Sequence, residues 1–284
     1  MIVPTTPRVW LITGCSSGLG HALATQVLAR GQRVIATARN PDALAELSAR
    51  YPATCRAVVL DVTDAAQAKA AIAQAAEVFG RLDVVVNNAG YGLVGAFEEL
   101  SEEQIARNFE TNFFGALRVI RAALPILRAQ GSGHIVNISA AAAIANYAGL
   151  SIYGATKCAL EGVSESLALE LRPLGINVTL VQPGPFRTGF VAHSFKATDD
   201  RIADYDRTSG KFSRLLETID GKQPGDPNKA ADAIIAAVES DAPPLRFVLG
   251  KYAHAKVRAK LAATEQELTQ WESVGLQTEF TSRP

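Results

Sequence analysis

Short apolar runs alternate with segments of helical periodicity along this chain, and this alternation limits the possible folds more than any other feature. The runs lie at residues 8–13, 32–37, 56–60, 82–87, 134–139, 175–181 and 245–249. Strands joined by helices of about 10 to 20 residues form right-handed crossovers, which give a parallel sheet with helices on both faces. We therefore predict a doubly wound α/β fold with a seven-stranded, mostly parallel sheet.

The 284 residues contain no repeat, low-complexity tract or linker, so one domain over residues 1–284 is the simplest organisation. Residues 185–225 lose clear periodicity but keep aromatic side chains, which is typical of a substrate lid. Residues 252–284 are expected to form a C-terminal helical extension. Its predicted apolar face comprises Val257, Leu261, Leu268 and Trp271.

Charge and cysteine content exclude several kinds of partner. The 28 basic and 28 acidic residues cancel, so nothing indicates a surface for nucleic acid. The cysteines Cys15, Cys55 and Cys158 are too widely spaced for a metal site or a disulfide framework, which favours a reduced compartment. No apolar run approaches the ~18 residues of a membrane span, and the first residues lack a signal-peptide pattern. We expect a cytoplasmic protein without a metal ion.

The first apolar run ends in a glycine-rich turn, Gly14-x3-Gly18-x-Gly20, and a helical pattern follows it. A strand, such a turn and a helix together direct backbone N–H groups and a helix N-terminus at a phosphate. Glycines also serve tight packing, so the turn alone has two interpretations. The sequence around it decides between them.

The second apolar run ends in Ala38 and Arg39. In dinucleotide-binding folds this strand tip meets the adenosine ribose, where an acidic residue would bind the 2′-hydroxyl. Here no carboxylate repels a 2′-phosphate and a guanidinium is available to bind one, which favours NADP(H) over NAD(H). The alternative for Arg39 is an ordinary solvated arginine at the start of a helix.

Tyr153 and Lys157 are four residues apart in a helical segment, so both side chains lie on one face of the helix. A nearby ammonium favours the phenolate form of a tyrosine and thereby prepares it for proton transfer. Ser139 ends the fifth apolar run and is expected beside this pair. Considered alone, the pair could also be a half-buried tyrosine beside a solvated lysine.

Taken together, these segments resemble the short-chain dehydrogenase/reductase (SDR) family, in motif order and spacing, over about residues 8–250. The matching motifs are Thr13-Gly14-x3-Gly18-x-Gly20, Asp61-Val62, Asn87-Asn88-Ala89-Gly90, Asn112, Ser139, Tyr153-x3-Lys157 and Pro183-Gly184. Details of the glycine turn and the second strand are similar to the subgroup of 17β-hydroxysteroid and retinol dehydrogenases. The resemblance implies a Rossmann-type, nucleotide-binding oxidoreductase.

The resemblance also implies four catalytic residues. Tyr153 would be the general acid in reduction and the general base in oxidation, and Lys157 would lower its pKa and hold the nicotinamide ribose. Ser139 would hydrogen-bond the substrate oxygen, where charge develops as hydride arrives. Asn112 would position a water behind Lys157, although an ordinary buried or helix-capping asparagine is the alternative.

Contacts with the cofactor follow from the same resemblance. The pyrophosphate would be wrapped by Gly14, Ser16, Gly18, Leu19 and Gly20. The adenine would meet Asp61 and Val62, for which a helix-capping Asp61 is the alternative. The ribose side would be lined by Asn88, Ala89 and Gly90, and the nicotinamide amide would be approached by Pro183, Gly184, Phe186 and Thr188. The catalytic residues Tyr153 and Lys157 would contact the cofactor as well.

These expectations describe an NADP(H)-dependent carbonyl reductase or alcohol dehydrogenase that interconverts an apolar ketone or aldehyde and its alcohol. The alternatives are an NAD-dependent alcohol dehydrogenase and a non-catalytic cofactor-sensing protein, while a sugar-nucleotide epimerase would need a larger C-terminal part. The substrate pocket is expected to include Tyr91, Ile144, Tyr147, Leu150, Phe190 and Phe195. The helix around Tyr153 and the long helix before it resemble the family's dimer surface, so we expect a homodimer or homotetramer.

Overall fold

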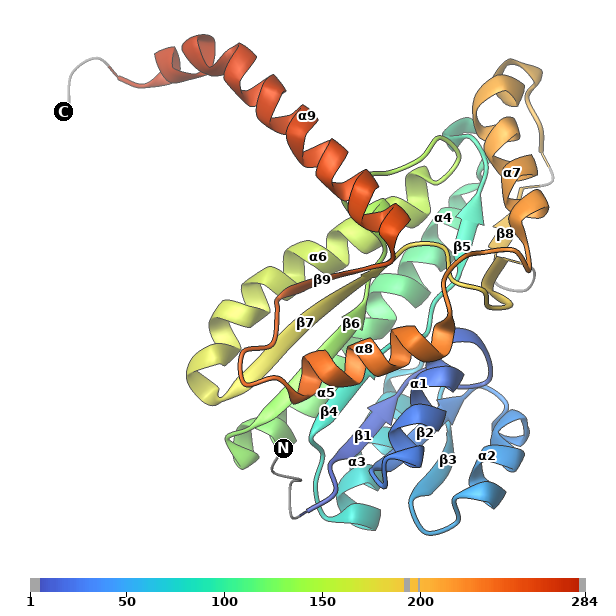
Figure 1. The fold of residues 1–284 in the computed structure, drawn as a ribbon, viewed down its shortest axis with the longest axis vertical. Coiled ribbons are helices and arrows are strands. Elements are labelled where there is room, and N and C mark those ends of the chain that lie inside the picture. The colour runs from blue at the N-terminus through green and yellow to red at the C-terminus, as the bar shows by residue number, and fades with distance from the viewer. Residues whose placement is uncertain (1–5, 192–194, 199, 281–284) are drawn as a thin grey trace.

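The computed structural model describes residues 6–191, 195–198 and 200–280, and these contain a seven-stranded parallel sheet (Figure 1). The strand order is β3-β2-β1-β4-β6-β7-β9. The strands are β1 (Val9–Ile12), β2 (Arg33–Ala38), β3 (Cys55–Val59), β4 (Val84–Asn87), β6 (Gly133–Ile138), β7 (Ile176–Pro183) and β9 (Arg246–Leu249). The predicted sheet is therefore confirmed, each strand lying within about two residues of its apolar run.

Helices cover both faces of this sheet, as the alternating pattern predicted. One face carries α1 (Gly18–Ala29), α2 (Ala45–Arg50) and α8 (Pro227–Glu239), and the other carries α3 (Ala65–Phe79), α5 (Gly115–Gln130) and α6 (Ser151–Leu171). Successive residues of β1 alternate between the two layers. Trp10 packs into the first layer and Leu11 into the second, and both are fully buried. The fold is a doubly wound Rossmann-type domain.

Polar side chains cap the starts of several helices. Ser101 Oγ accepts a hydrogen bond from the Gln104 backbone N–H at the start of α4 (Glu102–Phe109), and the Gln104 side chain accepts one from the Ser101 N–H, which completes a capping box. Asn40 caps the short 3₁₀ helix Pro41–Leu44. At α3 the cap is Asp64, which accepts from the N–H groups of the first turn, so Asp61 is not the helix cap.

The long helix expected after Ser101 consists of three parts. A single π-helical turn, Glu110–Phe114, joins α4 to α5. One-turn π segments inside helices rotate the following side chains and are frequent at functional sites. Here the turn carries Asn112, which is 1% exposed.

The expected lid, residues 185–225, is more regular than its sequence suggests. Its strand β8 (Phe195–Ala197) pairs in parallel with β5 (Gly92–Val94) to form a separate two-stranded sheet, and α7 (Lys211–Ile219) follows. A three-residue strand has too little periodicity to be read from sequence. Residues 192–194 and 199 lie outside the described part of the lid.

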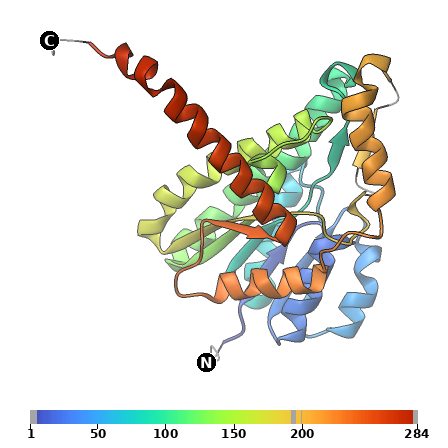
Figure 2. The same ribbon diagram turned by 45° about the horizontal axis from the view of Figure 1, so that its top comes forward.

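The last long helix, α9 (Lys251–Gly275), leaves the body of the domain and extends away from it (Figures 1 and 2). Only Ala253 and Val257 in its first two turns are buried. The described residues of the predicted extension are largely helical, and most of its predicted apolar face does not pack on the domain. Leu261, Leu268 and Trp271 are 58%, 66% and 64% exposed.

Candidate active site

The candidate residues gather at the carboxyl ends of the parallel strands, which is where ligands bind in open α/β sheets. Thr13 and Gly14 follow β1, Arg39 follows β2, and Asn88 follows β4. Ser139 follows β6, and Pro183 closes β7. The strand order places β4 between β1 and β6, so the glycine turn and Ser139 lie on the two sides of Asn88.

Thr13 and Asn88 hold the glycine turn in place. The Thr13 hydroxyl oxygen accepts hydrogen bonds from the backbone N–H groups of Asn88 and Ala89, both at 2.9 Å, and donates to the Val86 carbonyl at 3.3 Å. In return Asn88 Nδ2 donates to the carbonyls of Thr13 at 2.8 Å and Gly14 at 3.0 Å. Asn88 was predicted to line the ribose side, and Thr13 was not predicted as a site residue.

The backbone of this turn requires glycine. Gly14 has φ of 71°, in the left-handed region, and a Cβ there would lie 3.1 Å from the Ala89 Cα. Gly18 also has a positive φ, 62°. At the start of α1 the Ser17 side chain makes no capping hydrogen bond, so N–H groups of the first turn remain for an anion. The turn therefore fits the diphosphate of a dinucleotide.

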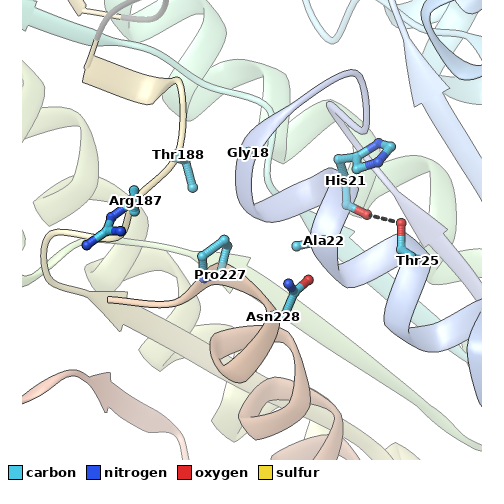
Figure 3. A pocket seen from close by; sticks show the side chains of 8 residues that line it. All are labelled: Gly18, His21, Ala22, Thr25, Arg187, Thr188, Pro227 and Asn228. Atoms are coloured by element: carbon cyan, nitrogen blue, oxygen red, sulfur yellow. Dashed lines mark hydrogen bonds between the residues drawn. The ribbon is translucent and has the colours of Figure 1, made fainter. Parts of the chain in front are cut away.

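A cavity of about 300 Å³ opens beside the turn (Figure 3). Gly18 and His21 of α1 form one wall, Arg187 and Thr188 form another, and Asn228 at the start of α8 closes the third side. Thr188 was predicted as a cofactor contact, and it is far from the glycine turn in the sequence. The fold brings it to that turn. Arg187 was not predicted, because no motif marks it.

The remaining predicted cofactor contacts differ in their exposure and in the groups that they contact. Arg39 is exposed and forms no ion pair with any other described residue. Asp61 Oδ1 accepts from the Thr63 N–H and hydroxyl, at 2.9 and 2.8 Å. Val62 is 5% exposed and belongs to the core, and Phe186 packs against the core on the α1 face. Ser16 is exposed, Leu19 and Gly90 are half-buried, Gly20 is buried, and Gly184 lies against Ala253.

Ser139, Tyr153 and Lys157 are brought together by β6 and α6. Lys157 Nζ donates to the carbonyl of Ile138, the residue before Ser139, at 2.8 Å. Ala140, the residue after Ser139, packs in one apolar cluster with Tyr153. Ser139 therefore lies near both the lysine and the tyrosine. Its Oγ is buried and has no hydrogen-bond partner within the described part of the chain.

Burial controls the proton affinities of this pair. It raises the pKa of the Tyr153 phenol above its ordinary value and lowers the pKa of the Lys157 ammonium to about 8. We expected Lys157 to lower the pKa of Tyr153, and in this structure the direction is the opposite. The physical reason is that the ammonium donates to the Ile138 carbonyl and lies 5.9 Å from the centre of the tyrosine ring, while the phenol itself is desolvated.

Asn112 is held by the chain itself. Its Oδ1 accepts from the Tyr91 N–H and its Nδ2 donates to the Tyr91 carbonyl, both at 2.9 Å. Nδ2 also lies 3.2 Å from Thr156 Oγ1, and that hydroxyl donates to the Tyr153 carbonyl at 2.7 Å. A Cβ on Gly90 would approach both Asn112 Oδ1 and Lys157 Nζ, so Asn112 lies near the lysine. Thr156 is a further site residue that the motifs did not reveal.

Aromatic side chains cover Tyr153. The ring centres of Phe190 and Phe195 lie 6.4 and 6.1 Å from that of Tyr153, and 5.0 Å from each other in an edge-to-face arrangement. Phe195 lies directly over Gly92, where a Cβ would collide with its ring. Leu150 and Tyr147 belong to the same cluster, so four of the six predicted pocket residues meet at Tyr153.

The other two predicted pocket residues lie elsewhere. Ile144 packs with Ala253 and Val257 at the base of α9. Tyr91 lines a separate cavity of about 330 Å³, where Lys196 lies 5.3 Å from the centre of its ring. Both predictions came from position along the chain, and the folding of residues 90–95 and 141–144 separates these side chains from the cluster.

Neither a metal site nor a membrane-spanning helix is found in the part of the chain that the structure describes. Within residues 6–191, 195–198 and 200–280 no group of three or more His, Cys, Asp or Glu side chains is placed to hold a metal ion. Over the same residues no helix has the length and the apolar character that crossing a membrane requires.

The sequence pattern of one known family, described as short chain dehydrogenase, matches residues 8–199, which include the glycine turn, Asn112, Ser139, Tyr153 and Lys157. This chain belongs to that family. The strand order, the glycine turn and the Tyr153–Lys157 pair of this short chain dehydrogenase agree with the expected fold and family.

Known relatives agree with this assignment. Retinol dehydrogenase 8 of Homo sapiens is 37% identical over 257 residues, which cover 84% of this chain and 80% of that protein. The structure of a short-chain dehydrogenase from Streptomyces avermitilis is 43% identical, covers 97% of this chain and 100% of that chain, and superimposes with a TM-score of 0.92. A short chain dehydrogenase/reductase from Burkholderia phymatum, solved in complex with NAD, shares the fold with a TM-score of 0.80 at 24% identity, covering 100% of this chain and 99% of that chain. This short chain dehydrogenase is an oxidoreductase.

Proposed function

We propose that this enzyme uses NADP(H) to interconvert an apolar ketone or aldehyde and its alcohol by hydride transfer. The observation that carries the proposal is the buried Ser139 hydroxyl, which has no partner among the described residues and is fixed beside Tyr153. An orphaned buried hydroxyl costs free energy unless a ligand satisfies it. A substrate oxygen placed between the Ser139 and Tyr153 hydroxyls would supply that partner.

Apolar surroundings favour an apolar substrate. Tyr153 shares its cluster with Phe190, Phe195 and Leu150, which offer dispersion contacts and few hydrogen-bonding groups. A polar substrate such as a sugar would lose its hydration there without compensation. The relative named retinol dehydrogenase 8 supports the same class, because retinol is an apolar alcohol.

Proton transfer would be assigned to Tyr153. In reduction its phenol gives a proton to the carbonyl oxygen while Ser139 donates a hydrogen bond to the same oxygen. The raised pKa of Tyr153 keeps the phenol protonated at neutral pH, which is the form that reduction requires. Lys157, next to it, would then stabilise the phenolate that the transfer leaves. The nicotinamide supplies or accepts the hydride.

Preference for the phosphorylated cofactor rests on Arg39. Its side chain follows β2, is exposed, and pairs with no acidic residue that the structure describes, while Ala38 before it offers no carboxylate to a ribose hydroxyl. A guanidinium and a phosphate form charge-assisted hydrogen bonds. The same tip with an acidic residue would favour NAD.

The test compares the dissociation constants of NADPH and NADH for the native chain and for Arg39→Ala. Loss of a charge-assisted contact, about 1.5–3 kcal/mol, predicts NADPH binding weakened by about 10- to 100-fold and NADH binding unchanged. Arg128→Ala, an exposed arginine on α5, is the matched control. Equal affinity for the two cofactors in the native chain would contradict the NADP preference and favour NAD-dependent alcohol oxidation. Binding without turnover of any apolar ketone, aldehyde or alcohol in a panel would favour a cofactor-sensing protein.

A further inference from the structure

The helix α9 is the part of the described chain with the least contact to the rest. It has 25 residues, about 37 Å of helix, and extends from the body with nothing beside its outer turns (Figures 1 and 2). Its residues from Arg258 onward are all exposed. An isolated helix gains little from its backbone alone, because most helix stability in proteins comes from a packed apolar face.

This helix carries an apolar face that packs on nothing in the described chain. Val257, Leu261, Leu268 and Trp271 recur at intervals of four, seven and three residues, so they share one side of the helix. Val257 is covered by the body, and the other three are more than half exposed. The stripe therefore continues from the domain into solvent.

The charges of α9 are segregated along its length. Its basic residues, Lys251, Lys256, Arg258 and Lys260, all precede its acidic residues, Glu265, Glu267 and Glu272. None of these seven side chains forms an ion pair with any residue that the structure describes. In the described chain α9 is thus a rod with one positive and one negative half.

This charge order destabilises a solitary helix. Lys251 in the first turn and Glu272 in the last turn oppose the helix macrodipole, which favours acidic residues at the start and basic residues at the end. Lys256 and Lys260 are also four residues apart, where like charges repel. The charges are therefore not arranged for the helix on its own.

We propose that α9 pairs with α9 of a second copy of this chain in an antiparallel arrangement. The basic half of each helix then lies along the acidic half of the other, the two macrodipoles oppose, and the stripe of Leu261, Leu268 and Trp271 is covered. A two-fold axis through the middle of the pair makes the interface self-complementary. The two domains lie at opposite ends of the paired helices.

Other occupants fit the charges less well. A parallel pair would place basic half against basic half and acidic half against acidic half. An anionic membrane surface attracts basic amphipathic helices, and the three glutamates of the outer half would be repelled by it. The surface that resembles the family's dimer contact, on α5 and α6, is separate from α9, and its role stays a prediction.

Sedimentation equilibrium of the full chain tests the pairing with two charge variants. The acidic variant carries Arg258→Glu and Lys260→Glu, and the basic variant carries Glu265→Lys and Glu267→Lys. Each alone is expected to have about half the weight-average mass of the native protein, because the exposed part of its α9, residues 258–272, then carries a net charge of a single sign. An equimolar mixture is expected to regain the native mass, since an acidic helix can pair with a basic one.

The control is a variant with the same change in charge outside α9, Lys69→Glu with Lys222→Glu, both exposed, which is expected to keep the native mass. Far-ultraviolet circular dichroism verifies that all variants are folded. Native mass in both charge variants, or a mixture that does not regain mass, would overturn the proposal. So would a native monomer that sediments with phosphatidylcholine–phosphatidylglycerol vesicles, because lipid would then cover the stripe.

Discussion

The carboxyl edge of the sheet and the outer turns of α9 are opposites in how they use their polar groups. At the edge, the side chains of Thr13, Asn88 and Asn112 make hydrogen bonds within the same domain. Along α9, seven charged side chains form no ion pair with the described residues. A preformed scaffold of this kind holds a ligand site in the absence of the ligand, whereas the exposed apolar stripe and the segregated charges of α9 favour a contact made outside the domain.

Tyr153→Phe is expected to have the largest effect. It removes the phenol hydroxyl, which is the proposed proton donor, and leaves the hydrogen bonds at the carboxyl edge of the sheet in place. The phenol oxygen makes no hydrogen bond to the described residues, and the ring keeps its contacts with Phe190 and Phe195. Loss of a positioned general acid should lower turnover by about 10²- to 10⁴-fold. Thermal unfolding should be unchanged, because the ring packing is kept.

The matched control for this variant is Tyr51→Phe, at the C-terminal end of α2 and away from the site, which should keep native turnover. If Tyr153→Phe retains more than about a tenth of native turnover, another group transfers the proton and the assignment of Tyr153 is wrong.

A smaller effect, on the free energy of unfolding, compares the carboxyl edge of the sheet with α9 directly. Thr13→Val removes the acceptor of the Asn88 and Ala89 N–H groups, and leaving such groups unsatisfied costs about 1–3 kcal/mol of unfolding free energy. Thr269→Val on α9 removes an exposed hydroxyl that bonds to its own helix, and should change the free energy by less than about 0.5 kcal/mol. Chemical denaturation measures both. Equal losses of unfolding free energy in the two variants would contradict the difference between the sheet edge and α9.

The smallest expected effect concerns Lys157 and pH. Because burial lowers its pKa from 10.5 to about 8, the unfolded chain binds a proton between these values that the folded chain does not. The free energy of unfolding should therefore rise with pH in this window, by about 1 kcal/mol between pH 8 and 9. Lys157→Met should lack this rise.

The buried thiols of Cys15 and Cys55 have the opposite effect on the free energy of unfolding at higher pH. Burial raises the pKa of Cys15 from 9.0 to about 12 and also raises that of Cys55, so their contribution to stability is lost as pH rises above about 9. Subtracting the profile of Lys157→Met from that of the native chain removes both contributions. A difference that is flat from pH 8 to 10 would mean that Lys157 titrates as a solvated lysine.

The sequence predicted the features that depend on neighbours along the chain. The strand runs and the helical segment that holds Tyr153 and Lys157 are local features, and both were confirmed in position. Contacts between distant segments were not predictable in this way. Thr13 acquires its role only because Asn88, 75 residues later, folds against it, and β8 becomes a strand only by pairing with β5.

The electrostatic prediction failed for a related reason. The helical spacing shows that Tyr153 and Lys157 share a face, and it carries no information on how deeply both are buried. Desolvation acts on each group separately, and here burial raises the pKa of Tyr153 and lowers the pKa of Lys157. The exposure of Leu268 and Trp271 could not be predicted from the sequence either. An apolar stripe has the same sequence pattern whether it packs on its own chain or on another.

Tyr147 joins the substrate cluster to the base of α9. Its ring stacks on Phe212 at 5.1 Å, its hydroxyl donates to that of Tyr252 at 3.2 Å, and Lys256 lies 3.4 Å from its ring centre. Two binding events that bear on the same residue are thermodynamically coupled, and the coupling is reciprocal. Pairing of α9 and occupation of the pocket should therefore strengthen or weaken each other by one common factor, so protein concentration becomes a variable of the apparent substrate affinity.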